Sequence, residues 1–112
     1  DEDRSTDIAR IADATAKRLD LDIRFRPEEI YNEDKYIGDR YGITTPEGIE
    51  AMKLVAKTEA VILDPVYSCK AMAGLIDHIR QGRIGKNEVV VFLHTGGTPA
   101  LFAYADDLKL DL

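Results

Sequence analysis

The order of the expected secondary-structure elements predicts an α/β fold, with parallel strands and flanking helices. Two short apolar runs, 59–63 and 89–93, have the pattern of strands that are buried on both faces. Three stretches with a 3.6-residue apolar period, 7–21, 45–57 and 68–81, have the pattern of helices. Helices that alternate with buried strands are typical of a parallel sheet.

Capping residues give the helix boundaries. Thr45 is expected at the N-cap of the second helix, and Pro46 stands at its first position, where a missing N–H costs nothing. Ser68 is expected to cap the third helix, and Gly82 has the C′ position after its end.

The other segments are less regular. The first helix is expected to begin at Thr6 or Asp7, because either side chain can accept a hydrogen bond from a free amide of the first turn. The remaining expectations are a short strand at 23–25, a long loop at 28–45, a short helix at 99–104 and a tail at 106–112.

Length and charge narrow the class of protein. A chain of 112 residues forms at most one domain, and its net charge of −6 argues against a nucleic-acid or anionic-membrane surface. No apolar run approaches the roughly 20 residues of a membrane span, and the N-terminus lacks a signal segment. A single cysteine favours a reducing, cytoplasmic location. Residues 1–112 are therefore expected to form a single unit.

The two buried strands need neighbours that this chain does not supply, and the sequence does not begin with methionine. Both observations lead us to expect that the unit is a fragment of a longer polypeptide.

Polar residues follow both predicted strands, where ligands of parallel sheets bind. Tyr67 and Ser68 follow the first strand; either they act on a ligand, or Tyr67 packs and Ser68 caps the helix. After the second strand, Thr95, Gly96 and Gly97 offer hydroxyl and N–H groups for an anion, although a plain strand-to-helix turn would have the same pattern. Because the polar loops after the two predicted strands are close in sequence, we expect them to line one shared pocket.

Other reactive side chains give weaker signals. Cys69 is expected to be a small buried residue rather than a nucleophile. Lys70 is expected to point to solvent, and His94 to be buried with a satisfied hydrogen bond. Tyr41 is expected to anchor its loop by packing. Two histidines and one cysteine at these spacings do not match a metal site.

Three motifs in order resemble a known enzyme family. They are Tyr41-Gly-Ile with Thr45-Pro-Glu-Gly, then the stretch 63–75, then 94–104. They are similar to the C-terminal region of D-cysteine desulfhydrases and 1-aminocyclopropane-1-carboxylate deaminases. The resemblance covers residues 8–104. It implies the tryptophan-synthase β-like fold and pyridoxal 5′-phosphate as cofactor. It also implies that this unit is the C-terminal part of a larger cofactor-binding domain.

The resemblance also implies a role for individual residues. Tyr67 matches the family's active-site tyrosine, and Tyr41 a second tyrosine that reaches the substrate. Ser68 matches the position beside the pyridine nitrogen, which is glutamate in deaminases and a hydroxyl residue in desulfhydrases. Thr95, followed by Gly96, matches a position that is leucine in deaminases and threonine in desulfhydrases. Family members usually have glycine where Cys69 stands, so the first turn of the helix is expected to be more crowded against the ligand.

The implied function is therefore a lyase that eliminates sulfide and ammonia from D-cysteine to give pyruvate, in a cytoplasmic homodimer. Alternatives are an aminocyclopropane-carboxylate deaminase, an elimination from another β-substituted amino acid such as cysteate, and a non-catalytic module that binds a small anion or a partner chain. The family's Schiff-base lysine lies upstream of the matching region. An upstream segment or a partner chain is thus expected to supply it.

Overall fold

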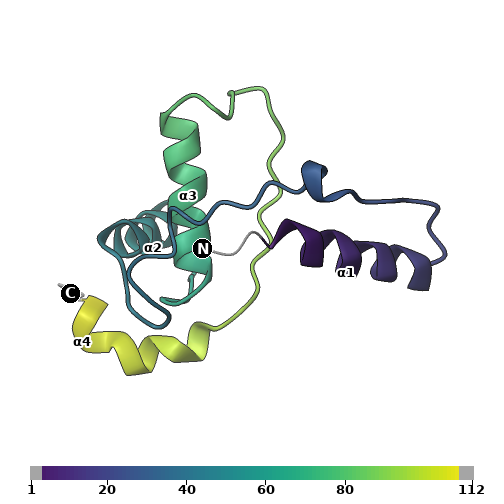
Figure 1. Cartoon of the computed structure of the whole chain (residues 1–112). Coiled ribbons are helices and arrows are strands. Elements are labelled where there is room, and N and C mark those ends of the chain that lie inside the picture. The colour runs from purple at the N-terminus through teal and green to yellow at the C-terminus, as the bar shows by residue number, and fades with distance from the viewer. Residues whose placement is uncertain (1–3, 109–112) are drawn as a thin grey trace. The chain divides into compact units, whose positions relative to one another are not determined.

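The computed structural model describes residues 4–108 and shows two compact units, Asp1–Asp34 and Lys35–Leu112 (Figure 1). Each unit is described by itself below. The expected tail at 106–112 lies partly outside the described residues, because only its first three residues, 106–108, belong to the described part, where they are helical.

The first unit consists of helix α1, Ser5–Arg18, and a segment that returns along it through a single 3-10 turn, Pro27–Glu29. The helix begins two residues before the expected start, after Arg4, and no side chain caps it. The returning segment is held by the amide of Phe25, which donates to the Asp13 carboxylate at 2.8 Å. Residues 23–25, expected as a short strand, have no strand partner.

The second unit is built on two packed helices, α2 (Pro46–Glu59) and α3 (Ser68–Arg80). A 3-10 helix, Thr98–Tyr104, and the short helix α4, Ala105–Leu108, follow the last long loop. Buried apolar side chains from α2, α3, α4 and the segment before α3 form one core, which consists of Met52, Val55, Leu63, Cys69 and Leu108.

The start of α2 confirms the sequence prediction. The Thr45 hydroxyl accepts a hydrogen bond from the amide of Gly48 at 3.1 Å, and Pro46 occupies the first helical position. The helix continues two residues beyond the expected end and stops at Ala60, which has a left-handed conformation with φ of 56°. The end of α3 at Arg80, with Gly82 in a left-handed conformation, also agrees with the prediction.

The expected parallel strands are not seen in residues 4–108. Residues 61–63 and 89–93 are extended but belong to no ladder. The physical reason is that a strand forms only by hydrogen bonding to another strand. Neither segment has such a partner within the described chain, as expected from the sequence. Val89, Val91 and Leu93 are instead 93%, 88% and 80% exposed.

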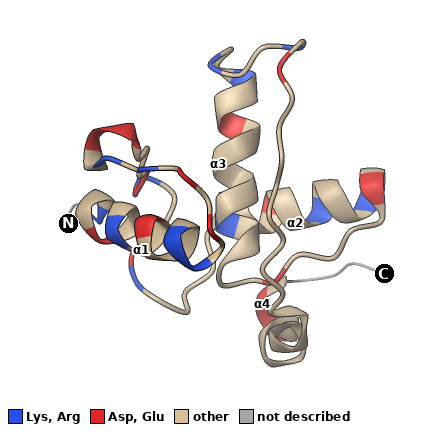
Figure 2. Cartoon of the chain, turned by 90° about the vertical axis from the view of Figure 1, so that its right-hand side faces the viewer, with Lys and Arg blue, Asp and Glu red and all other residues tan. Residues whose placement is uncertain are grey.

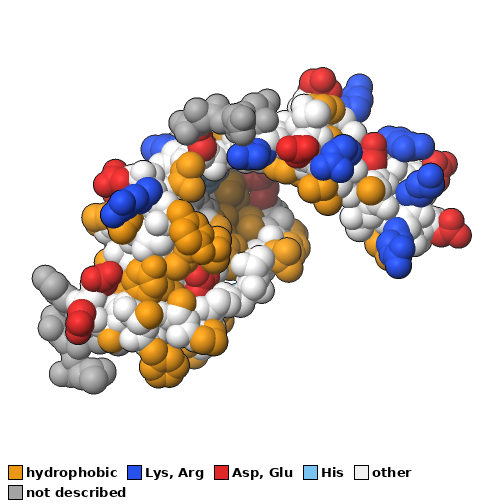
Figure 3. All heavy atoms as spheres, turned by 60° about the horizontal axis from the view of Figure 1, so that its bottom comes forward, with side chains coloured by type: hydrophobic (Ala, Val, Ile, Leu, Met, Phe, Trp, Pro, Cys, Tyr) orange, Lys and Arg blue, Asp and Glu red, His pale blue; other side chains and the backbone are white. Residues whose placement is uncertain are grey.

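Charge is unevenly distributed along the chain. Residues 89–104 contain no lysine, arginine, aspartate or glutamate, and they form a long uncharged stretch that begins near the charged C-terminal end of α3 and runs alongside this helix (Figure 2). Hydrophobic side chains are crowded on one face of the second unit (Figure 3). Among the residues described, no helix has both the length and the apolar character that crossing a membrane requires.

Candidate active site

The N-terminus of α3 is organised by Asp64, a residue that the sequence analysis did not single out. Its side chain accepts hydrogen bonds from the backbone amides of Val66, Tyr67 and Ser68, at 2.8, 2.9 and 2.7 Å. Asp64 therefore caps the helix, which the sequence had assigned to Ser68. The Asp-Pro turn before the helix was the available signal, because aspartate often bonds amides two or three residues further on.

Ser68 lies at the first position of α3 and is buried. Its hydroxyl donates to the Asp64 carboxylate at 2.5 Å and accepts from the Asp64 amide at 2.8 Å. Burial alone would raise the pKa of Asp64, but the hydrogen bonds from Ser68 and the neighbouring amides outweigh burial and hold this pKa below its usual value. Ser68 thus faces an ionised carboxylate.

Tyr67 and Tyr41, which are 26 positions apart in the sequence, meet at their hydroxyl groups. The two oxygens are 2.7 Å apart, and the ring centroids are 5.9 Å apart with the ring planes tilted by 57°. The hydrogen bond to Tyr41 raises the pKa of Tyr67, with partial desolvation as the next cause. Both rings are more than half exposed. Two phenols therefore face solvent next to the start of α3.

The loop that contains Thr95, Gly96 and Gly97 lies against the same turn. A Cβ atom added to Gly97 would stand 2.8 Å from the Asp64 side chain, so this loop and the cap of α3 are in direct contact. Thr95 is exposed, and a Cβ atom at Gly96 would meet no atom within 4 Å. The structure thus brings both predicted strand ends together.

His94 fixes the beginning of that loop. Its Nδ1 accepts from the amide of Gly96 at 3.0 Å, so Nε2 carries the proton and donates to the carbonyl of Ile62 at 2.8 Å. The side chain is exposed, contrary to the expectation of burial, but its two nitrogens are bonded as expected. His94 therefore joins the two extended segments through one neutral imidazole.

Cys69 is 1% exposed, and burial raises the pKa of its thiol to about 11. Its sulfur faces α2, where a Cβ atom on Gly48 would lie 3.1 Å from it. The crowding expected at this position is thus directed at the helix interface, and a thiol with this pKa is not a nucleophile at neutral pH. Across residues 4–108, no group of three or more potential metal ligands is assembled.

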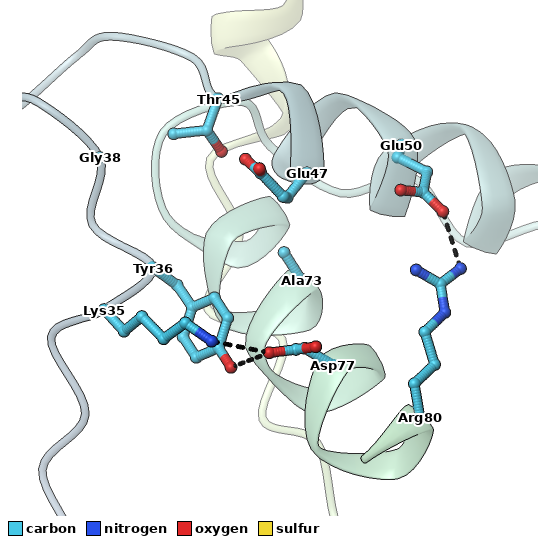
Figure 4. A pocket seen from close by; sticks show the side chains of 9 residues that line it. All are labelled: Lys35, Tyr36, Gly38, Thr45, Glu47, Glu50, Ala73, Asp77 and Arg80. Atoms are coloured by element: carbon cyan, nitrogen blue, oxygen red, sulfur yellow. Dashed lines mark hydrogen bonds and ion pairs between the residues drawn. The ribbon is translucent and has the colours of Figure 1, made fainter.

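A separate cavity of about 320 Å³ lies between the first turns of α2, the middle of α3 and the loop before Gly38 (Figure 4). Two ion pairs line it: Lys35 with Asp77 at 3.1 Å, and Arg80 with Glu50 at 2.7 Å. None of Tyr41, Tyr67, Ser68, Thr95 or Gly96 belongs to its lining. The cavity is therefore distinct from the cluster at the start of α3.

Comparison with known proteins gives the family. The model of a family described as pyridoxal-phosphate dependent enzymes matches residues 2–96. A solved structure described as an ACC deaminase homologue is 35% identical, with a TM-score of 0.75 over 96% of this chain and 31% of its own chain. The chain thus spans about a third of the length of that relative, and the resemblance fits the tryptophan-synthase β-like fold. The chain belongs to the family of pyridoxal-phosphate-dependent enzymes.

Proposed function

We propose that the protein containing this chain eliminates sulfide and ammonia from D-cysteine, with water, to give pyruvate. The observation that carries the proposal is the cluster at the start of α3: the Tyr41–Tyr67 pair, with hydroxyl residues at both Ser68 and Thr95. The resemblance associates hydroxyl residues at these two positions with desulfhydrases. A small amino acid is thus the proposed substrate.

The residues fit one side of a bound pyridoxal phosphate. Gly96 leaves open space above the backbone, and Thr95 offers an exposed hydroxyl next to it. The contact of Gly97 with Asp64 keeps this loop beside Ser68. When bound, the cofactor withdraws electrons from the α-carbon of the substrate, which makes the α-proton acidic. We propose that Ser68, Thr95 and Gly96 bind it on this side.

Ser68 would set the charge at the pyridine nitrogen. A hydroxyl is a weaker partner for a protonated nitrogen than a carboxylate is, so the ring is a weaker electron acceptor. That suffices where a good leaving group such as a thiol departs from the β-carbon. Opening a cyclopropane ring has no such leaving group and needs a stronger acceptor.

Tyr67 and Tyr41 would orient the substrate. A tyrosine is a phenol at neutral pH and can donate a hydrogen bond, and the hydrogen bond to Tyr41, which raises the pKa of Tyr67, favours this protonated form further. The pair shares one hydrogen bond of 2.7 Å, so at least one hydroxyl proton is left for a substrate carboxylate or a leaving group. We propose that this proton holds the substrate in place over the cofactor.

The remaining parts of the active site are proposed to come from elsewhere. The ammonium of Lys70 is directed at the carbonyl of Ile37, at 2.6 Å, and not towards the cluster. An upstream segment or a partner chain would therefore supply the Schiff-base lysine. The same segment would pair with residues 89–93, where Val89, Val90, Val91 and Leu93 are exposed. A cytoplasmic homodimer is the assembly we propose.

An aminocyclopropane-carboxylate deaminase is the second candidate, and two observations favour it. One is the similarity to the solved structure described as an ACC deaminase homologue. The other is Asp64. The Ser68 hydroxyl donates its single proton in the hydrogen bond to the Asp64 carboxylate, so towards a ring nitrogen the Ser68 oxygen can only accept a hydrogen bond. A protonated ring nitrogen would then be favoured, as it is beside a glutamate.

Product analysis of the intact enzyme distinguishes the two. D-Cysteine and aminocyclopropane-carboxylate are offered separately, with cofactor present, and sulfide with pyruvate is measured against 2-oxobutanoate. We expect sulfide and pyruvate from D-cysteine alone. The variants Ser68→Glu and Thr95→Leu, which introduce the deaminase residues, are expected to reduce this reaction while cofactor absorbance is retained.

Either alternative has its own outcome. 2-Oxobutanoate as the main product of the unmodified enzyme would refute the desulfhydrase proposal in favour of the deaminase. Absence of both products, with cofactor bound and the lysine-bearing segment present, would favour a non-catalytic module that binds a small anion or a partner.

A further inference from the structure

We propose that Lys70 is a positioning residue whose buried ammonium holds the loop 37–43 against α3, so that Tyr41 meets Tyr67. Lys70 is not assigned any role by the family resemblance, and the sequence predicted that it points to solvent. The structure shows the opposite, because only 7% of its surface is exposed.

The ammonium group ends on the backbone of the loop. Lys70 Nζ donates to the carbonyl of Ile37 at 2.6 Å, a short bond across 33 positions of sequence. A charged donor makes a stronger hydrogen bond than a neutral one, and the effect increases as water is excluded. Gly38 follows directly, and a Cβ atom on it would lie 3.8 Å from the same nitrogen. The loop therefore approaches the lysine closely.

The position of Lys70 on α3 relates this contact to the tyrosine pair. Residues three apart in a helix lie on the same side, so Tyr67 and Lys70 project towards the same loop. Tyr67 contacts the loop at Tyr41, and Lys70 contacts it at Ile37, four residues earlier. A loop fixed at Ile37 has few residues with which to move Tyr41 away.

The opposite end of the loop has its own anchor. The Tyr104 hydroxyl donates to the carbonyl of Gly42 at 2.7 Å. Tyr41 therefore lies between two backbone carbonyls that are each held by a long side chain, one from α3 and one from the 3-10 helix. The two anchors predict that Tyr41 loses its position when either is removed.

The choice of a lysine is itself informative. A buried ammonium in the first turn of a helix is unfavourable, because burial and the positive end of the helix dipole both oppose the charge. An apolar side chain of similar length would fill the same space without that penalty. The ammonium of Lys70 binds the loop carbonyl of Ile37, which the side chain of methionine or leucine cannot do.

The test uses the intact protein labelled with 3-fluorotyrosine and observed by ¹⁹F NMR, with Tyr41 and Tyr67 assigned through phenylalanine variants. Lys70→Met keeps the stem and deletes the donor. We expect both resonances to move towards their positions in urea, while the matched control Lys57→Met, at an exposed site on α2, leaves them unchanged. Unchanged resonances in Lys70→Met would overturn the proposal.

A second measurement does not depend on a variant that folds. In the unmodified protein, the ¹⁵N-labelled ammonium of Lys70 is expected to exchange its protons with water far more slowly than that of Lys57. Equal exchange rates for the two lysines would contradict the proposed bond.

Tyr104→Phe is expected to shift the Tyr41 resonance as well, since it releases the other end of the loop.

A kinetic test rests on the proposed function. If Tyr41 orients the substrate, Lys70→Met lowers kcat/KM by roughly ten- to a hundredfold, mainly through KM, with cofactor absorbance intact. A normal kcat/KM together with shifted tyrosine resonances would refute the role of Tyr41 in the reaction and leave the positioning by Lys70 supported. The two failures are therefore distinguishable.

Discussion

Asp77 shows how a single half-buried carboxylate organises its surroundings. Its Oδ2 atom accepts from the Tyr36 hydroxyl at 2.5 Å, from Gln81 at 2.7 Å and from Lys35 at 3.1 Å. These hydrogen bonds, that of Tyr36 foremost, lower the pKa of Asp77 from 3.8 to about 2 (Figure 4). The carboxylate thereby ties the start of the second unit to α3.

This shift predicts a pH dependence of stability. A lowered pKa in the folded state means that ionised Asp77 favours folding, fully above pH 3.8 and progressively less as pH falls towards 2. Asp77→Asn should therefore be less stable than the unmodified protein at neutral pH. The difference should shrink between pH 4 and pH 2. Urea unfolding at several pH values measures it, and a difference that stays constant over this range would contradict the assignment to Asp77.

Predictability also differs among residues. Thr45 and Pro46 were recognisable because capping chemistry is local and is contained within four residues. Asp64 was missed because a serine stood in the expected cap position, and Lys70 was misjudged because its partner lies 33 positions away. Tyr67 was noticed because it follows a predicted strand, whereas a substrate role for Tyr41 came only from the family resemblance. Nothing in the local pattern places their two hydroxyls together.

At the scale of elements, the contact between α2 and α3 depends on Gly48. A Cβ atom there would lie 3.1 Å from the Cys69 sulfur and 3.0 Å from the Thr45 hydroxyl oxygen. The two helices therefore meet at a glycine facing a small thiol. Alanine would gain about 1 kcal/mol of helix propensity but would crowd both neighbours.

We expect the crowding to dominate, so that Gly48→Ala destabilises the protein by about 1 to 3 kcal/mol. In a Cys69→Gly background the sulfur is gone, and the same substitution should cost less. A double-mutant cycle from urea unfolding gives the coupling energy between the two positions. Strictly additive effects would mean that the cysteine yields to the new methyl group without cost.

Elements also mark the limit of prediction from sequence. All three long helices were expected; α3 begins at the predicted residue, and the other ends differ from the prediction by one to three residues. The strands were not found within residues 4–108, because a strand depends on a partner whereas a helix bonds within itself. Within the described chain, the apolar runs 59–63 and 89–93 are covered only in part: Leu63 lies in the core and Phe92 packs against it, while Val89, Val91 and Leu93 remain exposed.

At the scale of the whole molecule, the stretch 89–93 exposes four apolar side chains in a row of five: Val89, Val90, Val91 and Leu93. A long apolar segment without charge or proline is a template for association with other strands. Residues 89–104 have no charged side chain to oppose it. The 112-residue chain on its own is therefore expected to self-associate.

Val91→Lys tests this expectation, because Val91 is 88% exposed and near the centre of the segment. We expect the variant to reduce self-association of the 112-residue chain, measured by light scattering after size exclusion. The control Leu54→Lys, on an exposed position of α2, should have little effect. Equal association of Val91→Lys and the unmodified chain would show that other residues drive it.

The contact of Gly97 with Asp64 has a consequence for engineering. With φ of 88° and the carboxylate 2.8 Å from a would-be Cβ, position 97 accepts no other side chain without displacing the cap of α3. Gly96 has a φ of 89° and is restricted by the same backbone conformation, so a mutant library meant to change substrate preference should randomise 95 and leave 96 and 97 fixed. Clones that vary at 97 would be lost to misfolding before any selection for activity could act on them.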